Sequence, residues 1–180
     1  MKNERIARLL KVKKQLFHID ELASLWSIDD DNLLRVTLSR YVKKGILNRV
    51  YRGFYVVQDL ENIDPVKLGQ KSYHAYCYLS TESVLVTEGL ISQKINYITL
   101  IGSRPKRFKI GSNSYYVRQL KNEFLYNDIG IDQKNGIFLA SRERAVADLL
   151  YFNPNYYLDG MNSNLIDWNK VKDIQQQIGY

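Results

Sequence analysis

The sequence predicts an α+β protein built from two domains, and three features carry that prediction. Residues 19–57 follow the order helix, turn, helix, hairpin. A polar segment, residues 58–66, then interrupts the pattern and contains Asp64-Pro65, a pair typical of a turn or of a new element. After it, short strand-like runs and short capped helices indicate a mixed α+β region. With 180 residues the chain can hold two small domains, which we expect at 1–58 and 59–180.

Local signals define the two helices of the first domain. A short helix is expected to open at Asp20, whose carboxylate can cap it. After a polar turn, a second helix should run from about Asp30 to Lys44. It should end at Gly45, because glycine readily adopts the left-handed conformation that follows many helices. The stretch 3–17 carries an apolar stripe and predicts a supporting helix.

Two strand-like runs follow the second helix, Leu47–Tyr51 and Phe54–Val57, joined through Arg52-Gly53. A helix-turn-helix followed by such a hairpin is the order of a winged helix-turn-helix domain. In the helix-turn-helix arrangement the second helix lies in the major groove of DNA. The sequence therefore predicts a winged helix-turn-helix at the N-terminal end of the chain.

The second helix predicts one buried and one exposed face. Leu34, Leu38, Tyr41 and Val42 recur at helical spacing and should pack inward. On the exposed side, guanidinium groups can read guanine and an amide can read adenine. We expect contacts to bases from Asn32, Arg35, Val36, Ser39 and Arg40. We expect contacts to the DNA backbone from Lys43, Lys44, Arg49 and Arg52. The alternative is that these charges are simply solvated.

The net charge of +7 is unevenly distributed. Residues 1–58 hold 12 Lys and Arg against 6 Asp and Glu, and residues 94–121 hold seven Lys and Arg and no acid. Binding to a polyanion would concentrate in these two segments and weaken with added salt.

The second basic segment has aromatic residues between its cations, namely Tyr97, Phe108, Tyr115 and Tyr116. Such strands can bind phosphates and stack bases, which makes this segment a candidate second nucleic-acid patch. In the alternative interpretation the aromatic residues form the core face of a sheet and the cations are solvated. The candidate cations are Arg104, Lys106, Arg107 and Lys109.

The second domain is predicted to be small and mixed α+β, with a largely antiparallel sheet. Ser80 and Ser141 are good N-caps and should open two helices, the first ending at Gly89 and the second before Pro154. Residues 111–113 have the composition of a hairpin loop. Further elements are expected as strands at 97–101, 107–110, 114–118 and 136–140 and as an amphipathic helix at 165–178.

The sequence offers no recognisable catalytic constellation. It lacks a glycine-rich phosphate loop, and neither His18 nor His74 has a serine or cysteine partner at a recognisable spacing. Asp132-Gln133-Lys134 resembles half of a nuclease motif, but it lies between glycines and is interpreted as a turn. Glu143 and Asp148 are five residues apart on a helix and so face different directions, whereas Asp148 can pair with Arg144. We therefore expect no enzyme, no cofactor and no metal site.

A single cysteine, Cys77, excludes an internal disulfide and fits a reducing compartment. No apolar run approaches the 18 or so residues of a membrane span, and the N-terminal stretch lacks the apolar centre of a secretory signal. The expected location is the cytoplasm, without a membrane partner. Without coiled-coil heptads, we expect a monomer or weak dimer that pairs on DNA. A surface patch of Tyr73, Tyr76 and Tyr78 is an alternative route to self-association.

Taken together, the motifs resemble one known family over about residues 16–152, the AbiEi-type antitoxins of bacterial abortive-infection, type IV toxin–antitoxin systems. The matching residues are Lys43-Lys44-Gly45, Arg52-Gly53-Phe54-Tyr55, Asp64-Pro65, Tyr78-Leu79-Ser80 with Glu82-Ser83 and Leu85, Gly89-Leu90-Ile91, Ala140-Ser141-Arg142-Glu143-Arg144-Ala145 and Asp148-Leu149-Leu150-Tyr151.

The resemblance implies a transcriptional repressor and antitoxin. Its winged domain would bind inverted repeats in double-stranded operator DNA and so autoregulate the operon. The second domain, 59–180, would be an AbiEi-like antitoxin domain that counteracts a cognate nucleotidyltransferase-like toxin, commonly without a stable complex. Two alternatives stay open: an RNA- or protein-binding interaction module, and a stand-alone winged-helix regulator without antitoxin activity.

Overall fold

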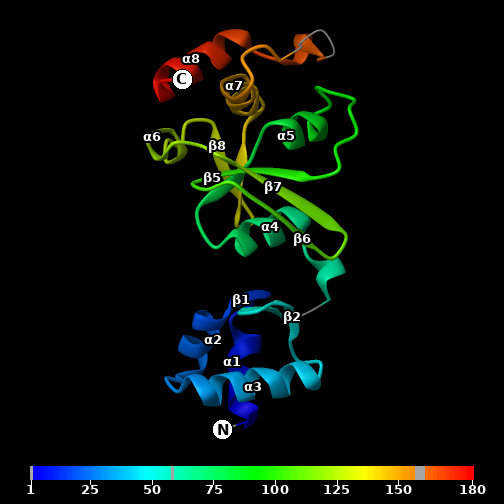
Figure 1. The fold of residues 1–180 in the computed structure, drawn as a ribbon, viewed down its shortest axis with the longest axis vertical. Helices are drawn as coiled ribbons and strands as arrows, with labels where there is room; N and C mark the ends of the chain where they lie inside the picture. Colours follow the sequence, from blue (N-terminus) through cyan, green and yellow to red (C-terminus); the bar gives the residue numbers. More distant parts are fainter. Residues whose placement is uncertain (1, 58, 157–160) are drawn as a thin grey trace. The chain divides into compact units, whose positions relative to one another are not determined.

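The computed structural model describes residues 2–57, 59–156 and 161–180 and has the α+β character that the sequence predicts (Figure 1). The chain divides into two compact units, Met1–Asp64 and Pro65–Tyr180. The division falls within the polar segment 58–66, six residues after the expected boundary at 58. Among the described residues, no helix combines the length and the apolar character needed to cross a membrane.

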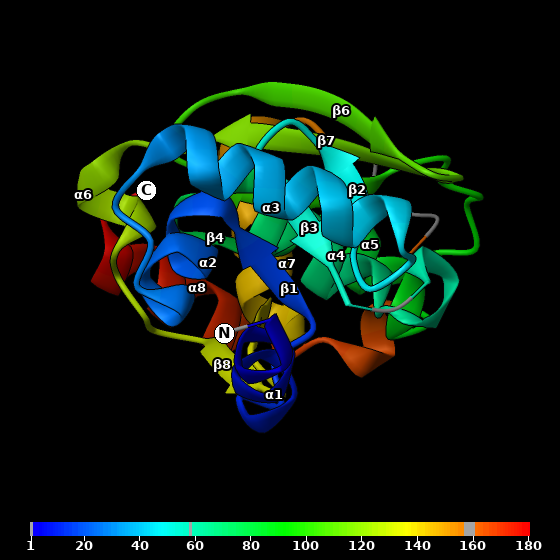
Figure 2. The same cartoon turned by 90° about the horizontal axis from the view of Figure 1, so that it is seen from below.

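The described residues of the first unit form three α-helices and a small antiparallel sheet. The axes of its first and third helices cross steeply (Figures 1 and 2). Its strands lie in the order β1-β3-β2. The elements are α1 (Lys2–Lys11), β1 (Leu16–His18), α2 (Ile19–Trp26), α3 (Asp31–Lys43), β2 (Asn48–Tyr51) and β3 (Phe54–Val56), followed by a 3-10 turn at Leu60–Asn62.

The first helix is shorter than the sequence predicts. It ends at Lys11, and Lys13 has a left-handed φ of 51°, which a continuing helix cannot accommodate. Leu16 and Phe17 are buried, but as part of β1, where Leu16 pairs with Val56 of β3. The prediction of a helix over 3–17 was therefore wrong at its end, because a three-residue strand has too little periodicity to be recognised.

The start of α2 also differs from the expectation. The N-cap is His18, two residues before the expected Asp20. The carboxylate of Glu21 accepts the His18 backbone N–H at 2.9 Å and is also bonded by Lys14. Burial by itself would raise the pKa of Glu21, but the hydrogen bonds from Lys14 and His18 lower it overall.

The boundaries of α3 agree with the local signals. Asp30 is its N-cap, and the Asp30 carboxylate accepts the Leu33 backbone N–H at 2.8 Å. The helix ends just before Gly45, which has a φ of 67°. Leu34 and Leu38 are buried as predicted. The rotation of α3 about its axis is thereby fixed, with its polar side directed outward.

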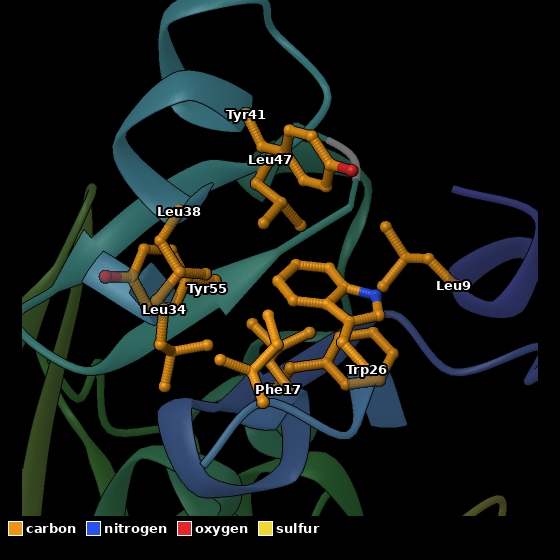
Figure 3. Packing of buried hydrophobic residues seen from close by; sticks show 10 residues of the cluster. Leu9, Phe17, Trp26, Leu34, Leu38, Tyr41, Leu47 and Tyr55 are labelled. Atoms are coloured by element: carbon orange, nitrogen blue, oxygen red, sulfur yellow. The ribbon is translucent and has the colours of Figure 1, made fainter. Parts of the chain in front are cut away.

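One apolar cluster holds the first unit together (Figure 3). Trp26 lies within it, edge-on to Tyr41 with ring centroids 5.3 Å apart. The indole N–H of Trp26 donates to the Arg5 carbonyl at 3.1 Å, which ties α1 to the end of α2. The ten buried members of the cluster are Leu9, Phe17, Leu22, Trp26, Ile28, Leu34, Leu38, Tyr41, Leu47 and Tyr55.

The second unit is a six-stranded sheet with helices on both faces. Figure 1 shows α4 on one face and α5 and α7 on the other, with α8 beside α7. The strand order is β6-β7-β5-β4-β9-β8. The elements are α4 (Pro65–Tyr73), β4 (Cys77–Leu79), α5 (Glu82–Thr87), β5 (Ile98–Gly102), β6 (Lys106–Ile110), β7 (Asn113–Gln119), α6 (Asn122–Leu125), β8 (Ile131–Lys134), β9 (Ile137–Ala140), α7 (Arg142–Phe152), a 3-10 turn (Ser163–Leu165) and α8 (Trp168–Ile178).

The sheet is mixed: most of its strand pairs are antiparallel, as predicted, and two are parallel. The pairs β4/β5, β6/β7 and β8/β9 are antiparallel, whereas β5/β7 and β4/β9 are parallel. The two parallel pairs join strands that are not consecutive in the chain, so hydrophobic periodicity could not reveal them. The β6/β7 hairpin turns at Gly111, where the sequence predicts a loop.

Two further local predictions were wrong. Ser80 does not cap α5, which has Thr81 as its N-cap; the Ser80 hydroxyl instead donates to Asp148 at 2.6 Å. Residues 132–134 form part of β8 and not a turn. The turn lies one step later, at Asn135 and Gly136, which both have positive φ as in a two-residue hairpin.

Candidate nucleic-acid interface

The exposed side of α3 carries all five predicted base-reading residues. Asn32, Arg35, Val36, Ser39 and Arg40 are exposed. Val36 has 52% of its surface accessible, a large value for an aliphatic side chain, and Leu33 beside it has 44%. The outward face of α3 therefore combines hydrogen-bonding groups with apolar surface, and both kinds of group are used to read base edges.

A groove runs between α3 and the β2–β3 hairpin, with a volume of about 710 Å³. It brings together five of the nine predicted site residues. Arg35, Ser39 and Lys43 come from α3, one helical turn apart, and Arg49 and Arg52 come from the hairpin. The other described residues that line it are uncharged: Ile19, Val42, Gly53 and Tyr55. Four cations thus surround one concave surface that no acidic side chain lines.

The hairpin geometry explains how its arginines reach the groove. Tyr51 pairs with Phe54, so Arg52 and Gly53 form the turn, and Gly53 has a φ of 86°. The register shifts between Arg49 and Tyr51, which marks a local irregularity of β2. The guanidinium Nε of Arg49 donates to the Tyr51 carbonyl at 3.4 Å. The hairpin is also tied to α2, because the Ile19 N–H donates to the Gly53 carbonyl at 2.8 Å.

Acidic side chains of the protein neutralise little of the positive charge of the four groove cations, Arg35, Lys43, Arg49 and Arg52. Arg35 is 3.8 Å from Asp31, but both side chains are mostly exposed, so this ion pair is weak. The other ion pairs within residues 4–57, 59–156 and 161–180 involve none of Lys43, Arg49 and Arg52. The positive charge is therefore available to an external anion.

Four predicted site residues lie outside the groove lining. Asn32, Val36 and Arg40 follow one another at i+4 along a neighbouring stripe of α3, and Lys44 is the residue at the C-cap. All four are exposed. Two adjacent stripes of α3 thus carry the predicted residues, and only one of them faces the hairpin.

The second predicted patch lies on the edge strand β6 and the loop before it. Arg104, Lys106, Arg107 and Lys109 are all exposed. The backbone N–H and carbonyl of Arg104 both bond the Tyr73 hydroxyl, which fixes the loop. Tyr115 is buried, as the core interpretation expects, and it also lines a hollow together with Tyr97 and Tyr116. Nucleic-acid binding by the four cations stays a prediction.

A buried ionic cluster was foreseen only in part. The sequence predicts the Arg144–Asp148 pair, and Arg144 Nε donates to Asp148 Oδ1 at 2.9 Å. It does not predict that both side chains are fully buried, nor that Ser80 and Tyr78 bond them. The available signal is that Asp148 is the one charged residue of the otherwise apolar stretch Ala145–Leu150, with Arg144 directly before it. Because its side chains lie in the interior, we assign this cluster to the stability of the second unit.

The other candidate residues do not line the groove. Burial raises the pKa of the Cys77 thiol to about 12, so it is not a nucleophile at neutral pH. His18 lies against Phe54, with ring centroids 4.6 Å apart. Tyr78 has no exposed surface, so the three-tyrosine surface patch was wrong. Asp132 is exposed on β8 and pairs with Leu139, and no group of acids, histidines or cysteines suited to a metal occurs among the described residues.

A scan of protein-family models finds none that matches the chain, and a search of curated proteins finds no match.

Proposed function

We propose that the first unit is a winged helix-turn-helix domain that binds double-stranded operator DNA. The observation that carries this proposal is the groove between α3 and the β2–β3 hairpin, where Arg35, Lys43, Arg49 and Arg52 surround one concave surface. In this assignment α2 and α3 are the helix-turn-helix, α3 is the recognition helix, and the hairpin is the wing.

The two ends of α3 would have different tasks. Arg35 and Asn32 lie in the first turns of α3, the part of a recognition helix that contacts base edges. Lys43, at the other end, would contact a phosphate, as would Arg49 and Arg52 from the wing. Phosphate contacts set the affinity and the register, and base contacts set the sequence preference. The exposed Val36 would contact a thymine methyl group.

In biological terms, the proposed activity is that of a repressor and antitoxin of a type IV toxin–antitoxin system. The groove supports the DNA binding that the repressor part needs: chains paired on inverted half-sites would block the promoter of their own operon. The antitoxin part rests on the family resemblance, which includes the motif Ala140–Ala145 and implies an action against a nucleotidyltransferase-like toxin. This activity needs no enzyme chemistry and no cofactor.

A reporter experiment tests both parts. The DNA upstream of the reading frame is fused to a reporter gene, and the protein is supplied in trans. Wild type should repress the reporter, and Arg35→Ala should lose repression. Lys172→Ala, which removes an exposed charge on α8, should repress like wild type.

In a second arm the neighbouring toxin gene is induced. If wild type and Arg35→Ala both rescue the cells from the toxin, this would support a separate antitoxin unit. If both fail to rescue the cells, this would favour a stand-alone regulator.

A further inference from the structure

We propose that the second unit has its own nucleic-acid site, a nucleotide-sized pocket at the β6 edge of the sheet that binds single-stranded nucleic acid. This pocket has a volume of about 400 Å³, within the range of small-ligand pockets. It lies wholly within the second unit. The proposal is therefore independent of duplex binding by the groove beside α3.

The strand register collects the pocket's polar groups on one face. Arg107 pairs with Tyr116 and Lys109 pairs with Ser114, so alternate positions of β6 and β7 carry these four side chains together. Tyr97, just before β5, joins them, because its ring meets that of Tyr116 edge-on with centroids 5.8 Å apart. Two cations, a hydroxyl and two tyrosine rings thus surround one hollow.

The guanidinium group of Arg107 lies over the ring of Tyr116. Its guanidinium carbon lies 4.5 Å from the centroid of the Tyr116 ring. Arg118 also lies near this ring, at 5.7 Å, but it is mostly buried and bonded to Glu82. Arg107 is exposed, and the ion pairs of the described residues include neither Arg107 nor Lys109. Arg118 is therefore neutralised, whereas Arg107 can act on an external ligand.

These groups match the parts of one nucleotide. A guanidinium group that lies over a ring can stack a base on its other face, and an exposed tyrosine ring can also stack a base. Tyr97 has 39% of its surface accessible. The ammonium of Lys109 can contact the adjoining phosphate, and the Ser114 hydroxyl can bond a sugar or phosphate oxygen.

The pocket favours a single strand over a duplex. In a double helix both faces of each base are stacked on neighbouring bases, so a ring or guanidinium cannot reach them. An unpaired base can leave the strand and enter a pocket of this size. Single-stranded RNA and single-stranded DNA share this chemistry, and the difference between them is the sugar 2′-hydroxyl.

The test is a fluorescence anisotropy titration of the full chain. All proteins carry Arg35→Ala and Arg52→Ala, which reduces the contribution of the first unit. The probes are fluorescein-labelled mixed-sequence RNA and DNA single strands of about ten nucleotides, matched to the site sizes of single-strand binders. Unlabelled duplex of the same sequence is the competitor. A higher affinity for the RNA probe would assign a role to the 2′-hydroxyl, and equal affinities would assign recognition to the base and phosphate.

Single substitutions separate stacking from charge. Tyr97→Ala and Arg107→Lys should each weaken single-strand binding about tenfold, because each removes a planar group that stacks on a base. Arg107→Lys keeps the positive charge, so its effect reports the loss of stacking alone. Tyr97→Phe should bind like the parent. Lys94→Ala is the matched control, an exposed cation of the same basic segment outside the pocket. Equal binding by Arg107→Lys and the parent would overturn the proposal, as would equally effective competition by the duplex.

Edge strands can also pair with a second copy of the same chain. Sedimentation of the same proteins with and without the probe covers this outcome. One strand bound per monomer supports the pocket. Dimerisation that is independent of the probe and is lost in Arg107→Lys would overturn the proposal in favour of a β6-mediated dimer.

Discussion

Arg144 and Asp148 form a fully buried ion pair, with Arg144 Nε donating to Asp148 Oδ1 at 2.9 Å. The remaining guanidinium nitrogens donate to the carbonyls of Asn127 and Ile129 and to the hydroxyl of Tyr78. Burial by itself would lower the pKa of Arg144, but the facing carboxylate of Asp148 more than offsets this and raises it. Arg144 therefore stays charged, and its hydrogen bonds join α7 to β4 and to the segment before β8.

Breaking this pair should strongly destabilise the second unit. Asp148→Ala leaves the buried guanidinium without its counter-charge, and we expect a loss of about 3–5 kcal/mol in the free energy of unfolding. Urea unfolding followed by circular dichroism measures this loss. Lys172→Ala, on the exposed side of α8, should change the stability by less than about 0.5 kcal/mol. A cost below about 1 kcal/mol for Asp148→Ala would show that the pair contributes little.

Arg35 should determine sequence preference. If its guanidinium makes a paired contact to a base, Arg35→Ala should reduce discrimination between the operator and a sequence changed at that base by about 1–3 kcal/mol. Competition binding with single-position operator variants measures this difference. A uniform loss of affinity across all variants would reassign Arg35 to the DNA backbone.

Lys43 should act without regard to sequence. Lys43→Ala should weaken the binding of operator and scrambled duplexes by the same factor, because a phosphate contact carries no base information. It should also reduce the slope of log affinity against log salt by about one, the value for one lost phosphate contact. An unchanged slope would remove Lys43 from the interface. Lys172→Ala again provides the charge-matched control.

Cys77 should be chemically inert in the folded protein. Burial raises the pKa of its thiol from 9.0 to about 12, so the folded state holds the thiol proton more tightly than the unfolded state does. The resulting stabilisation is fully present below about pH 9 and is lost as the pH rises toward about 12. At about pH 8 a disulfide reagent should react slowly with native protein and rapidly in denaturant. Rapid reaction of the native protein would contradict the burial of Cys77.

Local chemistry made parts of this structure predictable. Asp30 and Gly45 mark the ends of α3 through a side-chain cap and a left-handed residue, and both effects act within a few residues. The spacing of Leu34 and Leu38 then fixes which side of α3 is buried. With α3 oriented in this way, Arg35, Ser39 and Lys43 follow as one exposed stripe, and that stripe is one wall of the groove.

Other features depend on partners that are distant in the chain. α2 begins after His18 and not at Asp20, and the first N–H of the helix, that of Ile19, donates to the carbonyl of Gly53, which is distant in the chain. Ser80 is a plausible cap by local criteria, yet it bonds Asp148, which lies 68 residues later. The stack of Arg107 on Tyr116 likewise required the β6/β7 register. Periodicity carries no information about such pairings.

The central claim is that the α3 groove reads operator DNA, and an anisotropy titration tests it most directly. The duplex from upstream of the reading frame is compared with a scrambled duplex at about 50 and 200 mM salt. The account predicts selective binding by wild type that weakens with salt, and loss of that selectivity in Arg35→Ala. Equal affinity of wild type for both duplexes would contradict the account and leave the first unit without a role in DNA recognition.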